Sequence, residues 1–388
     1  MTNNLLIVHG GGPTAVLNAS LYGVIKEAKK YEQIDKVYGA IGGTEAILNE
    51  TFLDLAKTSD EELELLLQTP GTAIGSSRFV LEQEHYDKMV DVFKRNNIKY
   101  VLFNGGNGTM DTCGKLYELC KHEDIYTVGI PKTVDNDIAI IDHAPGYGSA
   151  AKFIANATAE IGADVKALPI HVTVIEAMGR NAGWITAASS LARKNKSDAP
   201  HLIYLPERPF DEEEFLTDVK ALYEELGGVV VVVSEGLKNK AGESIVPPIF
   251  KTDRAVYYGD VSAHLANLVI KKLGIKARSE KPGLVGRTSM AYQSTVDKQE
   301  AVRVGREAVQ AVVSGKTGVM VGIHRKSDSP YEMKTSLVPI SEVMLHEKEL
   351  PNQFINERGN DVTEEFVNWC KPLIGAETPE FINFKEKL

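Results

Sequence analysis

The chain has 388 residues, of which 43% are hydrophobic and 25% charged, so it can bury a large core and is expected to form two domains. Its formal net charge of −10 leaves no basic surface in bulk, which argues against nucleic acid as a partner. No apolar stretch approaches the length of a membrane span, and Cys113, Cys120 and Cys370 form no CxxC pair. We therefore expect a cytoplasmic protein with buried or incidental thiols that binds neither nucleic acid nor membranes.

The predicted strands and helices alternate along the chain. Short runs rich in β-branched and aromatic residues are separated by longer amphipathic segments. This alternation predicts βαβ units and an α/β fold of two Rossmann-like three-layer domains with mainly parallel sheets. The predicted strands are 5–9, 99–104, 125–130, 170–177, 202–206 and 229–236, and the predicted helices are 16–30, a segment from Met110, 211–226 and 256–274.

A glycine- and proline-containing passage, 141-IDHAPGYGS-149, predicts the crossover between the two domains. The residues after about 330 contain more Pro, Glu and Lys and no strong strand run, so we expect a C-terminal helical extension there. The predicted ranges are 1–140, rejoined by 256–305, for the first domain, 141–255 with 306–325 for the second, and 326–388 for the extension.

Two glycine-rich loops follow predicted strands directly. The first contains Gly11 and Gly12, and the second, 105-GGNGT-109, contains Gly106, Gly108 and Thr109. Free backbone N–H groups at the start of a helix favour an anion, and ligands of open α/β sheets bind at the carboxyl ends of strands. Neither loop has the spacing GxGxxG or GxxxxGK[ST], and the first loop alone could equally be a turn without a ligand. Together the loops favour a phosphate site.

The next predicted strand ends in 129-GIPKTVDNDI-138, which holds two carboxylates and a lysine. Phosphoryl transfer to an alcohol needs a group that accepts the hydroxyl proton, cations that spread the charge of the moving phosphoryl group, and oxygen ligands for Mg²⁺. Lys132, Thr133, Asp135 and Asp137 supply these residue types. Taken alone, the DND sequence could equally be an Asx-turn with solvated acids.

The motifs GGxGT, PKTVDND, 176-EAMGRNAGW-184 and SEGL, in this order and spacing, resemble those of the phosphofructokinase family over about residues 5 to 325. The resemblance implies an enzyme, a 6-phosphofructokinase that transfers phosphate to the 1-hydroxyl of fructose 6-phosphate and gives fructose 1,6-bisphosphate, with Mg²⁺ as cofactor. It also implies a homo-oligomer, a dimer or tetramer with shared active sites. The first domain would then bind the phosphate donor and the second the sugar phosphate.

The resemblance implies a role for each matched residue. Asp135 matches the catalytic base, Thr133 contacts the substrate and the transferred phosphoryl group, and Asp137 lies close to the metal and the base. Arg180, in the sugar-phosphate turn with Met178 and Gly179, would stabilise the transferring group. Further matched positions are Glu235 at the sugar hydroxyls, Arg278 (from a neighbouring subunit) and Arg287 at the sugar 6-phosphate, Gly11, Gly12, Arg78, Gly106, Gly108, Thr109 and Lys132 at the donor, and Asn107 as a weak metal ligand.

Two positions depart from the family pattern on the acceptor side. His171 stands where many members have an inter-subunit arginine, and Leu284 where many have a phosphate-contacting histidine. Another ketose phosphate, such as tagatose 6-phosphate, sedoheptulose 7-phosphate or a sulfonated analogue, therefore stays open as the acceptor.

The donor markers conflict. In this family a glycine at position 108 leaves room for the α-phosphate of ATP, whereas a lysine at position 132 is typical of pyrophosphate enzymes. Because steric exclusion should outweigh an electrostatic preference, Gly108 favours ATP, with pyrophosphate as the alternative. Asn107 replaces the aspartate typical of ATP enzymes and gives Mg²⁺ less charge compensation.

Two other functional classes share features with this sequence. A non-catalytic sensor of sugar phosphate or nucleotide could use the same scaffold, but it would have no need for Asp135, Thr133 and Arg180. A dinucleotide-dependent oxidoreductase is disfavoured because the sequence lacks GxGxxG.

Overall fold

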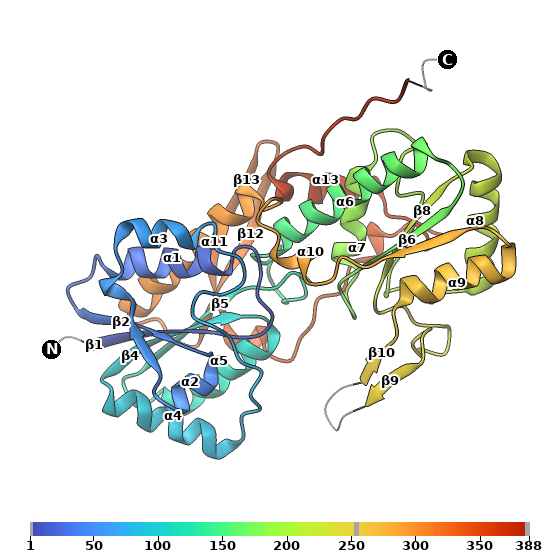
Figure 1. Ribbon diagram of the computed structural model, residues 1–388. Helices are drawn as coiled ribbons and strands as arrows, with labels where there is room; N and C mark the ends of the chain where they lie inside the picture. The colour runs from blue at the N-terminus through green and yellow to red at the C-terminus, as the bar shows by residue number, and fades with distance from the viewer. Residues whose placement is uncertain (1–2, 252–255, 385–388) are drawn as a thin grey trace. The chain divides into compact units, whose positions relative to one another are not determined.

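The computed structural model describes residues 3–251 and 256–384 (Figure 1). The chain divides into two compact units. Unit 1 comprises Met1–Ser149 and Arg287–Lys348, and unit 2 comprises Ala150–Gly286 and Glu349–Leu388. Within the described residues, every helix is too short or too polar to cross a membrane.

Unit 1 is built on a seven-stranded sheet in the order β13-β12-β5-β4-β1-β2-β3. The five central strands run parallel, and the two edge strands, β3 and β13, pair antiparallel with their neighbours. The chain passes from β1 to β2 on one side and later to β4 on the other, so the strand order reverses at β1. The strands are β1 (Asn3–His9), β2 (Ile34–Ala40), β3 (Phe52–Asp54), β4 (Ile98–Gly105), β5 (Tyr126–Pro131), β12 (Val319–Asp328) and β13 (Tyr331–Pro339).

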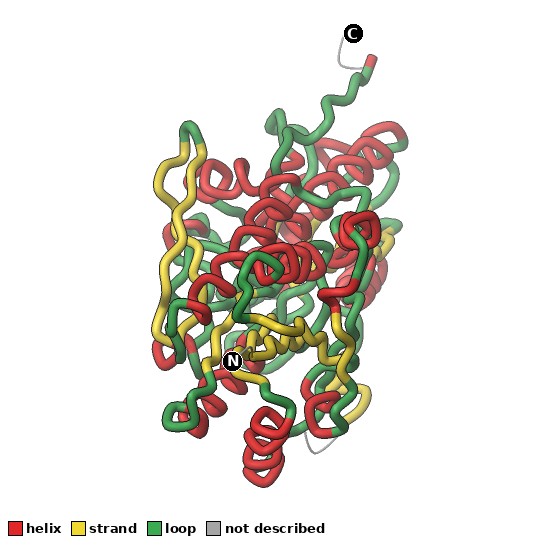
Figure 2. The backbone as a smooth tube through the Cα atoms, turned by 90° about the vertical axis from the view of Figure 1, so that its left-hand side faces the viewer, coloured by secondary structure: helices red, strands yellow, loops and turns green. Residues whose placement is uncertain are grey.

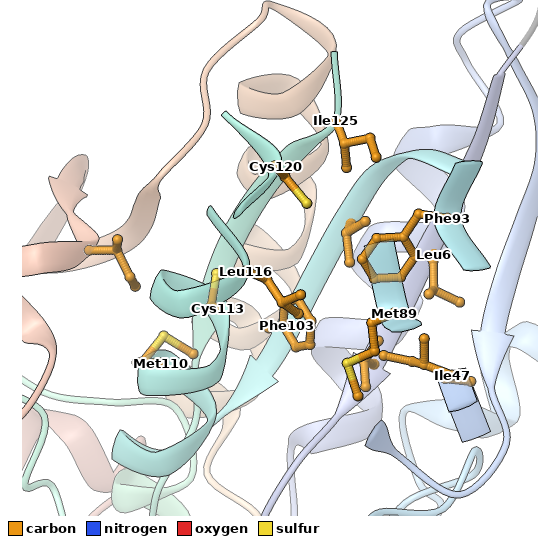
Figure 3. Packing of buried hydrophobic residues seen from close by; sticks show 14 of the residues in the cluster. Leu6, Ile47, Met89, Phe93, Phe103, Met110, Cys113, Leu116, Cys120 and Ile125 are labelled. Carbon is orange, nitrogen blue, oxygen red and sulfur yellow. The ribbon is translucent and has the colours of Figure 1, made fainter. Parts of the chain in front are cut away.

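Helices cover both faces of this sheet (Figure 1). Side chains alternate along each strand, so Leu6 of β1 packs beneath α4 and α5, whereas Leu5 packs beneath α1 and α11. Figure 3 shows the first of these layers, in which Phe93 and Met89 lie near Leu6. One face carries α2 (Thr44–Leu48), α4 (Gln83–Arg95) and α5 (Asn107–Cys120), and the other carries α1 (Leu17–Ala28), α3 (Asp60–Leu66) and α11 (Thr295–Val313); η1 (Leu55–Lys57) and α12 (Ile340–Val343) are short.

The three cysteines are buried thiols, as the sequence predicts. Cys113 and Cys120 lie in the layer of Figure 3, and burial raises the pKa of each of these two thiols to about 12. They are therefore inert packing residues.

Unit 2 contains a four-stranded parallel sheet in the order β11-β6-β8-β7. Its core forms where Phe215 and Val219 of α8 and Leu265 of α9 pack with the all-valine run of β8. The strands are β6 (Val172–Ala177), β7 (Leu202–Tyr204), β8 (Val229–Ser234) and β11 (Ala277–Glu280), with a separate antiparallel pair, β9 (Pro248–Lys251) and β10 (Val256–Tyr258). The helices are α7 (Trp184–Ala188), η2 (Ser189–Ala192), α8 (Glu212–Leu226), α9 (Val261–Leu273), η3 (Asn352–Phe354), α13 (Glu364–Cys370) and η4 (Lys371–Ile374). Two further helices cross the boundary between the units: α6 (Tyr147–Ala167) begins in unit 1 and α10 (Val285–Thr288) ends there.

The predicted α/β class with mainly parallel sheets is confirmed, but the predicted C-terminal helical extension is wrong. Residues 331–339 form β13, which pairs with β12 as a long antiparallel edge of the unit 1 sheet, visible along the left side of Figure 2. Residues after 348 belong to unit 2, where the Trp369 ring packs 4.9 Å from that of Trp184. The strand was missed because β13 is an edge strand with one mostly exposed face, which leaves no apolar run.

The compact units also differ from the predicted domain ranges. Residues 256–286 were expected to return to the first domain, but α9 packs on β6 and β8 in unit 2. Residues 306–325 were expected in the second domain, but Val304, Ala308 and Val312 of α11 pack on the unit 1 sheet. An amphipathic pattern shows that a helix covers a sheet without showing which sheet.

Candidate active site

The loops that follow β1, β4 and β5 lie side by side, because these three strands are neighbours in the sheet. The Gly10 N–H donates to the carbonyl oxygen of Asn104 at 3.0 Å, and the Lys132 N–H donates to that of Gly105 at 2.9 Å. Both glycine loops and the carboxylate loop therefore meet at one edge, beside the reversal of strand order where open α/β sheets bind ligands.

Thr109, in the first turn of α5, is the reason why two neighbouring positions must be glycine. A Cβ on Gly10 or on Gly105 would collide with the Thr109 side chain, so only glycine allows this helix to start between the two loops. Gly106 precedes the helix, and its backbone approaches that of Lys132 closely enough that an added Cβ would lie 3.5 Å from the Lys132 carbonyl oxygen. The N–H groups of the first turn of α5 thus open toward this edge of the sheet.

Three cations surround the Gly11–Gly12 backbone. Lys132 Nζ donates to the carbonyl oxygen of Gly12 at 2.6 Å. A Cβ on Gly12 would lie 2.8 Å from Nη1 of Arg287 and 3.9 Å from Nη2 of Arg78. The segment that carries Arg78 is held there by Ser76, whose hydroxyl donates to the Gly11 carbonyl oxygen at 2.8 Å.

Two of these cations, Lys132 and Arg287, have a lowered affinity for protons. Burial and the nearby charge of Arg287 lower the pKa of Lys132 to about 8, although the carboxylate of Asp135 opposes the effect. Burial and then the charge of Arg78 likewise lower the pKa of Arg287. Like charges held together at a glycine loop form a site that a polyanion would stabilise.

Asn136 organises the carboxylate loop. It adopts a left-handed backbone conformation with φ of 54°, which asparagine tolerates, and its Oδ1 accepts a hydrogen bond from the Ala144 N–H at 3.0 Å. The flanking Asp135 and Asp137 are thereby held on either side of a fixed residue, and the Asp135 N–H donates to Thr133 Oγ1 at 3.1 Å. The sequence pattern drew attention to the two carboxylates and missed this anchor.

Asn107 and Asp137 form the part of the site that fits a hard cation. The Asn107 Nδ2 donates to the Asp137 main-chain carbonyl oxygen at 3.4 Å, so the Asn107 side chain contacts the backbone of Asp137. Oδ1 of each is buried without a hydrogen-bond partner in the described part of the chain, and burial raises the pKa of Asp137. Oxygen atoms of this kind suit Mg²⁺, but no group of three or more His, Cys, Asp or Glu side chains that could hold a metal occurs among residues 3–251 and 256–384.

A cluster of charged residues, including Asp142 and His143, directly follows the carboxylate loop in the sequence. His143 contacts Asp142 Oδ2 through Nδ1 and Glu300 Oε2 through Nε2, each at 2.7 Å, and the Tyr331 hydroxyl donates to Glu300 Oε1 at 2.6 Å. Arg325 pairs with Asp142 at 3.2 Å. Burial opposes a charge on His143, yet Glu300 and Asp142 raise its pKa to about 9. We call Asp142, His143, Glu300, Arg325 and Tyr331 the His143 cluster.

Two more residues that the sequence analysis did not single out hold the same loop. Asp297 accepts hydrogen bonds from the Gly146 and Ser149 N–H groups, both at 2.8 Å. The half-buried Lys348 donates to the carbonyl oxygens of Ile141 and Asp142, at 2.9 and 2.8 Å. These supports come from distant parts of the chain, and no local sequence signal connects them with the loop.

In unit 2 the turn after β6 and the residues after β8 pack together. The Gly179 N–H donates to Glu235 Oε1 at 3.3 Å, and the Ser234 hydroxyl donates to the Gly179 carbonyl oxygen at 2.5 Å. Gly179 has φ of 118°, which favours glycine, and Gly236 permits contact with the backbone of Arg180. Met178 is half-buried and Arg180 is exposed.

The two arginines predicted to bind the sugar 6-phosphate lie in different units, and each is described within its own unit. Arg278 belongs to unit 2, where it is exposed on β11 opposite Thr173 and beside His171. Arg287 belongs to unit 1 and lies at the Gly11–Gly12 loop. Within unit 1, Arg287 is therefore part of the predicted donor site.

The family model described as Phosphofructokinase matches residues 4–312. The chain belongs to the phosphofructokinase family. The resemblance drawn from the four motifs is thus confirmed.

Three similar proteins bear on the donor and acceptor. The chain is 37% identical to a "Pyrophosphate--fructose 6-phosphate 1-phosphotransferase" of Rhodospirillum rubrum, over 98% of this chain and 96% of the relative. It is 33% identical to a "Sulfofructose kinase" of Alkalicoccus urumqiensis, over 95% of this chain and 94% of the relative. The crystal structure of a pyrophosphate-dependent phosphofructokinase from Marinobacter aquaeolei matches with a TM-score of 0.89 and 35% identity, over 98% of this chain and 94% of that one.

Proposed function

We propose that this phosphofructokinase transfers a phosphoryl group from pyrophosphate to the 1-hydroxyl of fructose 6-phosphate, giving fructose 1,6-bisphosphate. The observation that carries the proposal is the convergence of Arg78, Lys132 and Arg287 on the Gly11–Gly12 loop, close to the carboxylate of Asp135. The names of the Rhodospirillum relative and the Marinobacter structure support the same donor and, for the former, the same acceptor.

The two donor markers have different physical weight. A Cβ on Gly108 would meet no atom within 4 Å, so this position has room for a larger donor but does not require one. Lys132, in contrast, is a buried cation beside two arginines, and a compact polyanion would offset that repulsion. The absence of a side chain at position 108 allows either donor, whereas the uncompensated buried charge of Lys132 favours a compact polyanion. We therefore favour pyrophosphate over the ATP expected from the sequence.

The remaining family roles follow from the residues that match. Asp135 would accept the proton of the sugar 1-hydroxyl, and Thr133 would contact the substrate and the transferred group. On unit 2, Arg180 would face the transferring group, and Glu235 with Met178 and Gly179 would bind the sugar. Arg278 would bind the sugar 6-phosphate from a neighbouring subunit, which keeps the homo-oligomer a prediction.

Mg²⁺ would be held by Oδ1 of Asn107 and of Asp137, together with oxygens of the donor, because both side-chain oxygens are buried without partners. When bound, the ion would neutralise donor charge during transfer. The neutral amide of Asn107 leaves this side of the site with less negative charge than a second carboxylate would.

Sulfofructose is a second candidate acceptor. The Alkalicoccus relative supports it, and so does the grouping of Arg287 with the donor loop, which leaves Arg278 as the predicted residue for the group at C6. A sulfonate carries one negative charge where a phosphate carries up to two, so fewer arginines would suffice.

The test is a comparison of initial rates with pyrophosphate and with ATP over fructose 6-phosphate, sulfofructose, tagatose 6-phosphate and sedoheptulose 7-phosphate, with Mg²⁺ added or removed by a chelator. We expect the highest kcat/KM with pyrophosphate, Mg²⁺ and fructose 6-phosphate. A higher kcat/KM with ATP would overturn the donor, and a higher value with sulfofructose would replace the acceptor. Ligand binding without turnover under every condition would indicate a sensor.

A further inference from the structure

Two polar side chains lie buried without satisfied hydrogen bonds beside the donor site. His9 ends β1 and Asn104 lies directly opposite on β4, and both are 0% exposed. In the part of the chain that the structure describes, Nε2 of His9 and both amide atoms of Asn104 have no hydrogen-bond partner. Because an unmade hydrogen bond on a buried polar group is costly, these residues are poor choices for mere packing.

The hydrogen bonds of Thr72 determine which nitrogen of His9 carries the proton. The Thr72 hydroxyl donates to the Gly75 carbonyl oxygen at 3.1 Å, so its oxygen must accept the 2.7 Å hydrogen bond from Nδ1 of His9. Burial and the nearby Lys132 lower the pKa of His9 to about 3, so the ring is neutral. Nε2 is therefore a bare acceptor, held in place by Thr72.

The unpaired atoms lie on the same side of the sheet as Lys132. Ile7, Leu102 and Ile130 pack into one layer, so side-chain alternation puts His9, Asn104 and Lys132 on that same face. In register Asn104 lies beside Ile130, and Lys132 follows two residues further along the chain. The ammonium of Lys132 can donate three hydrogen bonds, and within the described residues it has one acceptor, the Gly12 carbonyl oxygen.

We propose that His9 and Asn104 are positioning residues that hold the Lys132 ammonium at the pyrophosphate site. The Asn104 amide donates toward Nε2 of His9 and accepts from Lys132, through one water on either side. Thr72, which bonds to His9, belongs to the same segment as Arg78, and Ser76 of that segment bonds to the Gly11 carbonyl oxygen. These contacts therefore connect both Lys132 and Arg78 with the Gly11–Gly12 loop. This inference rests on the proposed pyrophosphate donor.

Two substitutions of His9 separate positioning from structural support. The amide of asparagine reaches the position of Nδ1 and can keep the bond to Thr72, whereas that of glutamine reaches the position of Nε2 and can keep the contact toward Asn104. We expect His9→Asn to raise the KM for pyrophosphate at least tenfold and His9→Gln to stay within about threefold of the native enzyme. The KM for fructose 6-phosphate and the melting temperature should change little in either variant.

Asn104→Leu removes the bridging amide at similar volume and should raise the KM for pyrophosphate like His9→Asn. Ser20→Ala is the control, because Ser20 is another buried residue of unit 1 with an unpaired hydroxyl. Binding of pyrophosphate, measured by calorimetry, gives a readout independent of turnover and should weaken in the same order.

The outcomes separate the two proposals. If the native enzyme turns over with ATP and not with pyrophosphate, the proposed function fails and this inference fails with it. If the native enzyme uses pyrophosphate but His9→Asn, His9→Gln and Asn104→Leu bind it like the native protein, only the inference is overturned. A larger loss in His9→Gln than in His9→Asn would assign His9 to structural support of Thr72.

Discussion

Unit 1 contains two charged regions, the Gly11–Gly12 loop and the His143 cluster, which differ in how their charges are compensated. At the Gly11–Gly12 loop, Arg78, Lys132 and Arg287 repel one another. In the His143 cluster, opposite charges alternate and contact each other at 2.7 to 3.3 Å. The compensated cluster stabilises the fold, whereas the uncompensated cations are left for a ligand. The predictions below test this division.

The largest expected effect is on turnover. Asp135→Asn should lower kcat by about 10²–10⁴-fold, because the base that accepts the hydroxyl proton is lost. It should also leave the KM for pyrophosphate equal or lower, because the carboxylate that competes for the cations is neutralised. Steady-state kinetics on both substrates measure this, with the melting temperature as the control for folding. A kcat within tenfold of the native value would contradict the role of Asp135.

The next effect is on stability. Glu300→Leu leaves the His143 charge buried beside one carboxylate fewer and should lower the free energy of unfolding by about 3–5 kcal/mol. The matched control is Arg303→Ala on the same helix, which removes an exposed pair with Glu307 and should cost less than about 1 kcal/mol. Urea denaturation compares the two. Equal losses would show that the cluster is not what stabilises this region.

A substitution at the Gly11–Gly12 loop should weaken donor binding and leave the stability unchanged. Arg287→Met should raise the KM for pyrophosphate about 10–100-fold, because a hydrogen bond to a charged group contributes about 1.5–3 kcal/mol. It should not lower the free energy of unfolding, because it removes repulsion. Arg287→Lys should recover part of the affinity, since it keeps the charge without the planar pair of donors. A rise in the KM of the sugar phosphate instead would return Arg287 to the role expected from the sequence.

The smallest expected effect is a pH dependence. The pKa of His143 is raised to about 9, so the folded protein keeps a proton that the unfolded chain releases near pH 6.5. Its stabilisation is complete below about pH 6.5 and is lost as the pH rises through about 9, with a slope of at most about 1.4 kcal/mol per pH unit. Lys132 and Lys348, whose pKa values are lowered to about 8, act in the opposite sense at higher pH. Chemical denaturation between pH 6.5 and 8 should show the slope, and His143→Gln should flatten it.

Part of the candidate site could be predicted because its determinants are local. A glycine loop that directly follows an apolar strand and precedes a helix can be recognised within about ten residues of sequence. The structure has this arrangement at Gly11–Gly12 and at Gly106–Thr109. The same holds for Asp135 and Asp137 around the turn at Asn136. The identity of the phosphate donor was harder to predict, because the two marker residues act differently. Gly108 leaves room for either donor, whereas the buried charge of Lys132 needs an anion to compensate it.

Other parts depended on contacts between distant segments. Nothing near Glu300 or Tyr331 in the sequence indicates that both meet His143, 157 and 188 residues away. Asp297 and Lys348 support the loop from similarly remote positions. The placement of Arg287 at the donor loop belongs to the same group, since its local context, a turn-rich passage, is equally compatible with a surface position.

The sequence by itself therefore determined the α/β class, the strand ends that carry glycine and carboxylate, and the family. Only the tertiary structure decided that β12 and β13 join the first sheet with α11 packed on it, that β11 joins the second with α9 packed on it, and that His9 and Asn104 share a face of the sheet with Lys132. The physical reason is the range of the interactions. Side-chain periodicity and turn geometry act over a few residues, whereas sheet order and charge compensation are chosen by the packing of the whole unit.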